Sequence, residues 1–114
     1  MNVQLLKAKI YKLGFPSRNF DLVFSWAVLI YIAPDRIHQV ITELVRVSRK
    51  RILLAEFHDG SLTESKFDNH WVYNYSLLFK KHSALIKSVN ISRIPEMNQG
   101  DWGKYGSYIE VSLF

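Results

Sequence analysis

The chain has 114 residues, of which 48% are hydrophobic and 14% aromatic, and this composition predicts one folded globular domain over residues 1–114. It contains no cysteine, which excludes disulfides, thiolate metal sites and a cysteine nucleophile and fits a cytoplasmic protein. The net charge of +5 raises nucleic-acid binding as an alternative, although a solvated basic surface is the commoner cause of such a charge.

The N-terminal part of the sequence predicts two strands. Residues 3–10 are apolar and partly alternating, which indicates the first strand. Residues 12–19 gather Gly, Pro, Ser and Asn, which is typical of a turn. Residues 20–25 are the second predicted strand, and their consecutive apolar residues 22–24 indicate burial on both faces, as in a parallel sheet.

A helix and a further strand follow. Pro34 suits the first helical position because its missing N–H costs nothing there, and Asp35 is favoured in the first turn by the helix dipole. Apolar residues then recur at steps of three and four, at Ile37, Val40, Ile41, Leu44 and Val45. We expect residues 49–51 to end the helix and residues 52–57 to form a buried strand. Strand, helix and strand make a βαβ unit, whose strands are parallel and whose crossover is right-handed.

The C-terminal half predicts a helix and a strand pair. Residues 58–66 are expected to form a loop, and aromatic and apolar residues at helical spacing predict a helix over residues 71–83. Residues 85–94 are a predicted strand. Residues 95–105 are polar and contain glycine, which indicates a connection, and the alternating residues 107–114 predict a strand that pairs with the one before it.

Several segments resemble, in order, the class I S-adenosylmethionine-dependent methyltransferases of the small-molecule type 11 and 12 kind. These segments are Asn-Val-Gln-Leu-Leu at 2–6, Lys-Leu-Gly-Phe-Pro at 12–16 and Phe-Asp-Leu-Val-Phe-Ser at 20–25, followed by a loop and a helix with Arg-Val at 46–47. The resemblance implies an α/β fold with a partial Rossmann-like methyltransferase sheet. In that sheet a βαβ unit is followed by a helix and an antiparallel C-terminal strand pair.

The resemblance also implies S-adenosylmethionine as cofactor. The positions that it places at the cofactor are Lys9, Ile10, Ser25, Trp26, Ala27, Leu29 and Ile30. The family often has an aspartate at the first of these, and a lysine cannot accept a hydrogen bond from the adenine amino group. The glycine-rich turn of the family's first half does not occur in the 114 residues. We therefore expect the C-terminal half of a methyltransferase, inactive as this chain alone.

Three further residues lie near predicted strand ends on the cofactor side: Tyr31, Glu56 and His58. They are candidates for orienting or deprotonating a methyl acceptor. The alternatives are a plain strand-terminal carboxylate for Glu56, an exposed loop histidine for His58 and a core tryptophan for Trp26. The four histidines lack metal-ligand spacing, so we expect no metal site.

Three functions remain open at this point. The first is a methyltransferase fragment acting on a small-molecule or sugar-linked acceptor. The second is a non-catalytic interaction module that retains the fold remnant, and the third is a basic RNA-binding domain. An unpaired hydrophobic edge at residues 20–25 predicts a homo-oligomer or a strand-exchanged dimer. No apolar run approaches the roughly 20 residues of a membrane span.

Overall fold

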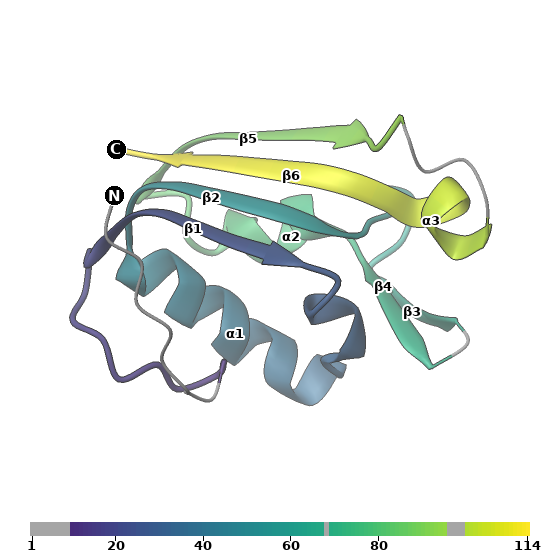
Figure 1. Ribbon diagram of the computed structural model, residues 1–114, viewed down its shortest axis with the longest axis horizontal. Coiled ribbons are helices and arrows are strands. Elements are labelled where there is room, and N and C mark those ends of the chain that lie inside the picture. Colours follow the sequence, from purple (N-terminus) through teal and green to yellow (C-terminus); the bar gives the residue numbers. More distant parts are fainter. Residues whose placement is uncertain (1–9, 68, 96–99) are drawn as a thin grey trace.

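The sheet of this protein has the strand order β1-β2-β6-β5. The computed structural model describes residues 10–67, 69–95 and 100–114. The strands are β1 (Phe20–Trp26), β2 (Ser48–Phe57), β5 (Ile86–Arg93) and β6 (Gly106–Leu113). β1 and β2 are parallel, and β6 is antiparallel to both of its neighbours (Figure 1). The predicted βαβ unit and the antiparallel C-terminal strand pair are therefore confirmed.

Helix α1 (Pro34–Val47) joins the two parallel strands and begins as the sequence predicts, with Pro34 in the first turn. Its N-cap is Ala33. Its C-terminus differs, because residues 49–51 belong to β2 and not to the helix. The last carbonyls of the helix, those of Arg46 and Val47, accept hydrogen bonds from the backbone N–H groups of residues 18 and 19. These partners satisfy the helix end, so that the chain turns into the strand at Ser48.

Most of the hydrophobic core lies between the helices and one face of the sheet. Helix α2 (Tyr75–Lys80) packs beside α1, and both helices lie on the same side of the strands (Figure 1). The sheet contributes alternate residues of its strands to this core, namely Val23, Ile52, Leu54, Ile109, Val111, Val89 and Ile91. Ile10 also packs against this cluster, whereas the rest of the predicted strand over residues 3–10 lies outside the described residues.

The prediction that β1 is buried on both faces is wrong. Leu22, Phe24 and Trp26 are exposed by 52%, 73% and 51%. The intervening Val23 packs against the core. The reason is that the helices cover one face of the sheet, and in the described part of the chain β1 has a neighbouring strand on one side only. Among the residues that the structure describes, the expected hydrophobic edge at residues 20–25 is therefore present.

The region between β2 and β5 departs most from the prediction. A hairpin of β3 (Glu64–Phe67) and β4 (His70–Tyr73) replaces the end of the predicted loop and the start of the predicted helix. The helix of this region spans only Tyr75–Lys80. Asn74 causes the late start, because its side chain accepts a hydrogen bond from the backbone of Leu77 and acts as the N-cap.

A short helix, α3 (Gly100–Tyr105), lies in the segment for which the sequence predicts a plain connection. It ends against the first residue of β6, where a Cβ atom on Gly106 would lie 2.5 Å from the carbonyl oxygen of Trp102. The chain therefore needs glycine at this junction because a side chain has no room. Among the described residues, no helix is long and apolar enough to cross a membrane.

Candidate functional site

The candidate site is built around the loop that leaves the C-terminal end of β1. Ala27 follows the strand with a φ of 56°, a left-handed conformation that costs a non-glycine residue about 1 kcal/mol. Its backbone N–H donates to the carbonyl of Ala55 on β2 at 3.0 Å. A single 3₁₀ turn, η1 (Leu29–Tyr31), then leads toward α1. The strained turn and its bond to β2 fix the direction in which the loop leaves the sheet.

Glu56, near the end of β2, anchors this loop through hydrogen bonds to its side chain. Its side chain is fully buried. Its carboxylate accepts hydrogen bonds from the backbone nitrogens of Val28 at 3.2 Å, Leu29 at 2.9 Å and Ile30 at 3.2 Å. A fourth comes from the Ser25 hydroxyl at 2.9 Å. The first N–H groups of a helix have no partner within it, so the carboxylate supplies the acceptors that η1 lacks.

Two effects oppose each other at this carboxylate. Burial raises the pKa of Glu56 to about 7, against the four hydrogen bonds, which lower it. Removal from water penalises the charged form, whereas donors pointing at the oxygens favour it. All four of these donors come from residues 25–30 at the end of β1 and in the loop that follows it. The geometry makes Glu56 a positioning residue for the loop.

Aromatic side chains surround the outer end of the loop. The ring of Trp26 stacks with that of Trp102 at a centroid distance of 6.5 Å, and Trp102 meets Phe57 edge-on at 4.6 Å. The exposed ring of Tyr31 lies 5.1 Å from that of His70. The site thus presents the exposed rings of Trp26 and Tyr31 near the ends of this loop.

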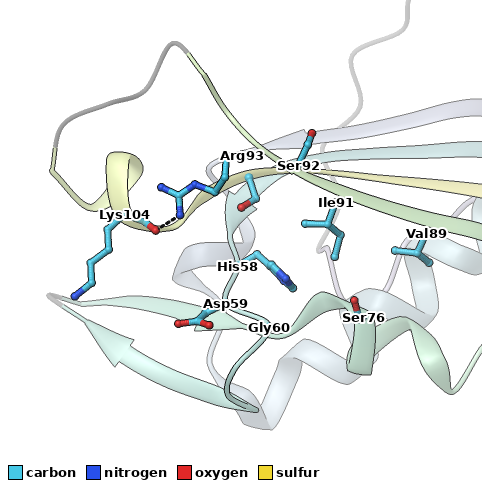
Figure 2. Close-up of a pocket in the computed structure, with 10 residues that line it drawn as sticks. His58, Asp59, Gly60, Ser76, Val89, Ile91, Ser92, Arg93 and Lys104 are labelled. Carbon is cyan, nitrogen blue, oxygen red and sulfur yellow. Dashed lines mark hydrogen bonds between the residues drawn. The ribbon is translucent and has the colours of Figure 1, made fainter.

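His58 lies two residues beyond Glu56 but belongs to a different environment. Its backbone N–H donates to the carbonyl of Tyr105 at 3.0 Å, and its ring nitrogen Nδ1 accepts from the backbone N–H of Tyr75 at 3.1 Å. The ring lines a cavity between β5 and the segment after β2 (Figure 2). His58 is therefore directed toward this cavity, whereas Glu56 is directed toward the β1 loop.

The structure brings together most of the predicted cofactor residues. Ser25 lies near the end of β1, and Ala27, Leu29 and Ile30 lie on the following loop that Glu56 organises. Their side chains differ in exposure, since Leu29 and Ile30 are buried in the protein whereas Trp26 is half exposed. Ile10 packs against the core beside α1, and Lys9 lies outside the described residues.

The sequence reasoning missed several residues of the site. Trp102 and His70 both contact Phe57. The ring nitrogen Nδ1 of His70 lies 4.0 Å from a carboxylate oxygen of Asp101. The aromatic residues of α3 were the available signal, because a polar connection with a tryptophan and a tyrosine three residues apart indicates a packed helix face. Among the described residues, no group of three or more His, Asp or Glu side chains is placed to hold a metal ion.

Comparisons with known proteins agree with this geometry. A family model described as a methyltransferase domain matches residues 1–55. The fold is similar to that of a Burkholderia thailandensis 1,6-didemethyltoxoflavin-N1-methyltransferase solved with bound 1,6-didemethyltoxoflavin and S-adenosylhomocysteine, at 14% identity and a TM-score of 0.64. That similarity covers 93% of this chain and 48% of the other. A comparison with curated protein sequences found no match.

Two further solved structures show the same relationship. A methyltransferase from Aquifex aeolicus is 18% identical with a TM-score of 0.61, and the similarity covers 99% of this chain and 56% of that one. A protein from Pyrococcus horikoshii is 14% identical with a TM-score of 0.64, and the similarity covers 99% of this chain and 60% of that one. This chain therefore spans about half to three fifths of the length of these proteins.

Proposed function

Since this chain carries a part of the class I S-adenosylmethionine-dependent methyltransferase fold, we propose that it acts as the C-terminal portion of a methyltransferase for a small-molecule or sugar-linked acceptor. The observation that carries the proposal is the rigid loop at the end of β1. Its backbone is fixed by Glu56 at the place where the resemblance puts the methionine part of the cofactor. A preset backbone is what positioning of a donor and an acceptor requires.

The residues at this loop fit the proposed cofactor. S-adenosylmethionine, when bound, supplies the methyl group. The half-exposed ring of Trp26 offers a π face for an adenine or a sulfonium, whose positive charge such a face attracts. The exposed hydroxyl of Tyr31 can orient an acceptor. Glu56 keeps the loop in place, and the ring of His58 lines the neighbouring cavity.

We expect this chain alone to bind the cofactor weakly and to transfer no methyl group, because the glycine-rich turn of the family does not occur in its sequence. The test is a titration of ¹⁵N-labelled protein with S-adenosylhomocysteine, followed by NMR. Amide shifts confined to residues 25–31, with a dissociation constant on the order of millimolar, are the expected result. Shifts that avoid this loop would contradict the proposal.

A pair of variants on one strand sharpens this test. Trp26→Ala removes the aromatic face beside the loop, whereas Phe24→Ala removes a more exposed ring two residues earlier on the same side of β1. We expect the first variant to weaken the S-adenosylhomocysteine shifts and the second to leave them unchanged. Equal effects of the two variants would show non-specific contact with the exposed sheet face.

A second candidate function is supported by the open edge of β1. In the described part of the chain this strand pairs with β2 alone, and three of its apolar side chains are half exposed or more. An edge of this kind pairs readily with a strand of another chain. We propose that β1 forms a homo-oligomer contact with a second copy, and that the chain also acts as an interaction module.

A further inference from the structure

A cavity of about 480 Å³ lies away from the β1 loop, between β5, the start of β6 and the segment that follows β2. Its floor is apolar and consists of Val89 and Ile91 on β5. Its walls are polar and include His58, Ser76 and Arg93 (Figure 2). The volume is within the range of small-molecule sites, which combine an apolar surface with a few polar groups.

The protonation of the His58 ring is fixed by its surroundings. Because Nδ1 accepts a hydrogen bond from the Tyr75 backbone at 3.1 Å, the proton of the neutral ring resides on Nε2. Burial lowers the pKa of His58, which keeps the ring neutral. A Cβ atom on Gly60 would lie 3.6 Å from Nε2, so Nε2 faces the space beside Gly60 that a side chain would otherwise fill. The cavity therefore contains a permanent N–H donor at neutral pH.

Charged groups of both signs line the cavity, and Arg93 places a positive charge at its rim. Arg93 is held at the rim by hydrogen bonds to the carbonyl oxygens of Gly103 and Lys104, and each of its terminal nitrogens has a second N–H group. The carboxylate of Asp59, also in the wall, already accepts two hydrogen bonds from Ser61, at 2.8 and 2.6 Å. The side chain of Lys104 points away from the cavity in Figure 2.

We propose that this cavity is a binding site for a small organic acid. The carboxylate of the bound acid accepts hydrogen bonds from Nε2–H of His58 and from the hydroxyl of Ser76, and Arg93 supplies positive charge at the rim. The apolar body of the acid lies on Val89 and Ile91. Charge-assisted hydrogen bonds give the carboxylate its orientation, and the apolar floor distinguishes an organic acid from an inorganic anion.

Benzoate is a suitable probe because it joins a carboxylate to a flat apolar ring. We expect saturable NMR shifts at the Nε2 of His58 and at the backbone amides of Ser76 and Ile91. Benzamide, which lacks the charge, and inorganic phosphate, which lacks the ring, should each bind at least about tenfold more weakly. Phosphate binding as tightly as benzoate would overturn the assignment to an organic acid.

Two variants test the site without disturbing the fold. Gly60→Ala places a methyl group beside Nε2 at ordinary contact distance, and Ser76→Ala removes an exposed hydroxyl. Each should weaken benzoate binding by about tenfold. Gly14→Ala, where a Cβ atom meets nothing within 4 Å, is the matched control and should bind benzoate as the unmodified chain does.

The outcome is independent of the proposed methyl transfer because no methyl donor is present in the measurement. Absence of shifts at the cavity residues, or equal benzoate binding by Gly60→Ala and the unmodified chain, would overturn the proposal. Long-range ¹H–¹⁵N spectra of the histidine rings provide a further measurement. A proton on Nδ1 of His58 instead of Nε2 would remove the donor on which the site depends.

Discussion

Oε1 of Glu56 lies 2.9 Å from the backbone nitrogen of Leu29, and this bond joins β2 to the 3₁₀ turn that follows β1. The same carboxylate also binds the backbone of Val28 and Ile30 and the hydroxyl of Ser25. Neighbouring parallel strands thus share one buried side chain at their C-terminal ends. Because cofactors of open α/β sheets bind at those ends, this side chain controls the geometry of the proposed site.

Replacement of Glu56 by alanine should lower the free energy of unfolding by about 3 to 5 kcal/mol, since it leaves a cavity and several buried donors without an acceptor. Denaturant unfolding measures this loss, and amide hydrogen exchange should accelerate first at Val28, Leu29 and Ile30. Glu110→Ala is the matched control, because Glu110 is exposed on β6 and its loss should change stability by less than about 0.5 kcal/mol. Similar stabilities for the two variants would contradict the anchoring role.

The stability of the protein should also depend on pH through Glu56. Its pKa is raised from 4.5 to about 7 in the folded chain, so the folded state retains a proton that the unfolded state releases. This contribution is fully present below pH 4.5, falls as the pH rises and is lost above pH 7, a total of about 3 kcal/mol.

Glu56→Gln isolates this contribution because glutamine has a similar shape and does not titrate. The difference in unfolding free energy between the unmodified chain and this variant should change by about 3 kcal/mol between pH 4.5 and pH 8. His58, whose pKa is lowered by burial, acts in the opposite sense in both proteins and cancels in the difference. A pH-independent difference would show that Glu56 titrates normally.

The sequence predicted the sheet well because the pattern of apolar residues there reflects burial directly. The stripe of α1 and the alternation of β6 are periodic, and both were found where expected. The same reasoning failed over residues 71–83. Trp71 and Tyr75 have helical spacing, yet Asn74 between them caps a helix that starts later, and the preceding residues pair with β3. Local spacing could not indicate this long-range pairing.

The site was only partly predictable for a different reason. The sequence shows a glutamate at position 56 and correctly predicts that it lies near the end of a strand. Whether its carboxylate points outward to an acceptor or inward to the β1 loop depends on the left-handed turn at Ala27, which no residue type signals. The contact of Trp102 with Trp26 likewise joins segments far apart in the sequence, so that periodicity could not predict it.

Gly106→Ala should destabilise the protein by about 2 kcal/mol, because the new methyl group would lie 2.5 Å from a backbone oxygen of Trp102 and 2.8 Å from its ring. The clash displaces α3, so tryptophan fluorescence should change along with the unfolding midpoint. Gly14→Ala is the control, since its added methyl group meets no atom within 4 Å. An unchanged midpoint for Gly106→Ala would mean that α3 does not pack against β6 in solution.

Arg46 should contribute more to stability than a surface arginine usually does. Its guanidinium binds Glu43 at 2.7 Å and the carbonyl oxygens of Phe15 at 2.8 Å and Leu13 at 2.9 Å, which ties α1 to the segment before β1. Arg46→Ala should lower the unfolding free energy more than a typical surface substitution does, and Arg46→Lys should restore little, because lysine lacks the planar fork.

Arg49→Ala is the matched control for this prediction. Arg49 forms an ion pair with Asp21 in which both side chains are more than half exposed, and such pairs contribute about 0 to 1 kcal/mol. Urea unfolding of the variants at one pH measures the difference. Equal losses for Arg46→Ala and Arg49→Ala would show that the segment before β1 is not held by Arg46.

The last prediction concerns β1, which pairs with β2 alone in the described part of the chain. If two copies associate through this strand, light scattering after size-exclusion chromatography should detect a dimer whose population rises with concentration. Phe24→Lys places a charge on a side chain that is 73% exposed, so it should weaken the dimer at least about a hundredfold while the monomer stays folded. Phe114→Lys is the matched control, because Phe114 is 70% exposed but lies at the chain end beyond β6, so this variant should dimerise normally. An unmodified chain that remains monomeric at all concentrations, or a Phe24→Lys variant that still dimerises, would exclude β1 as the contact.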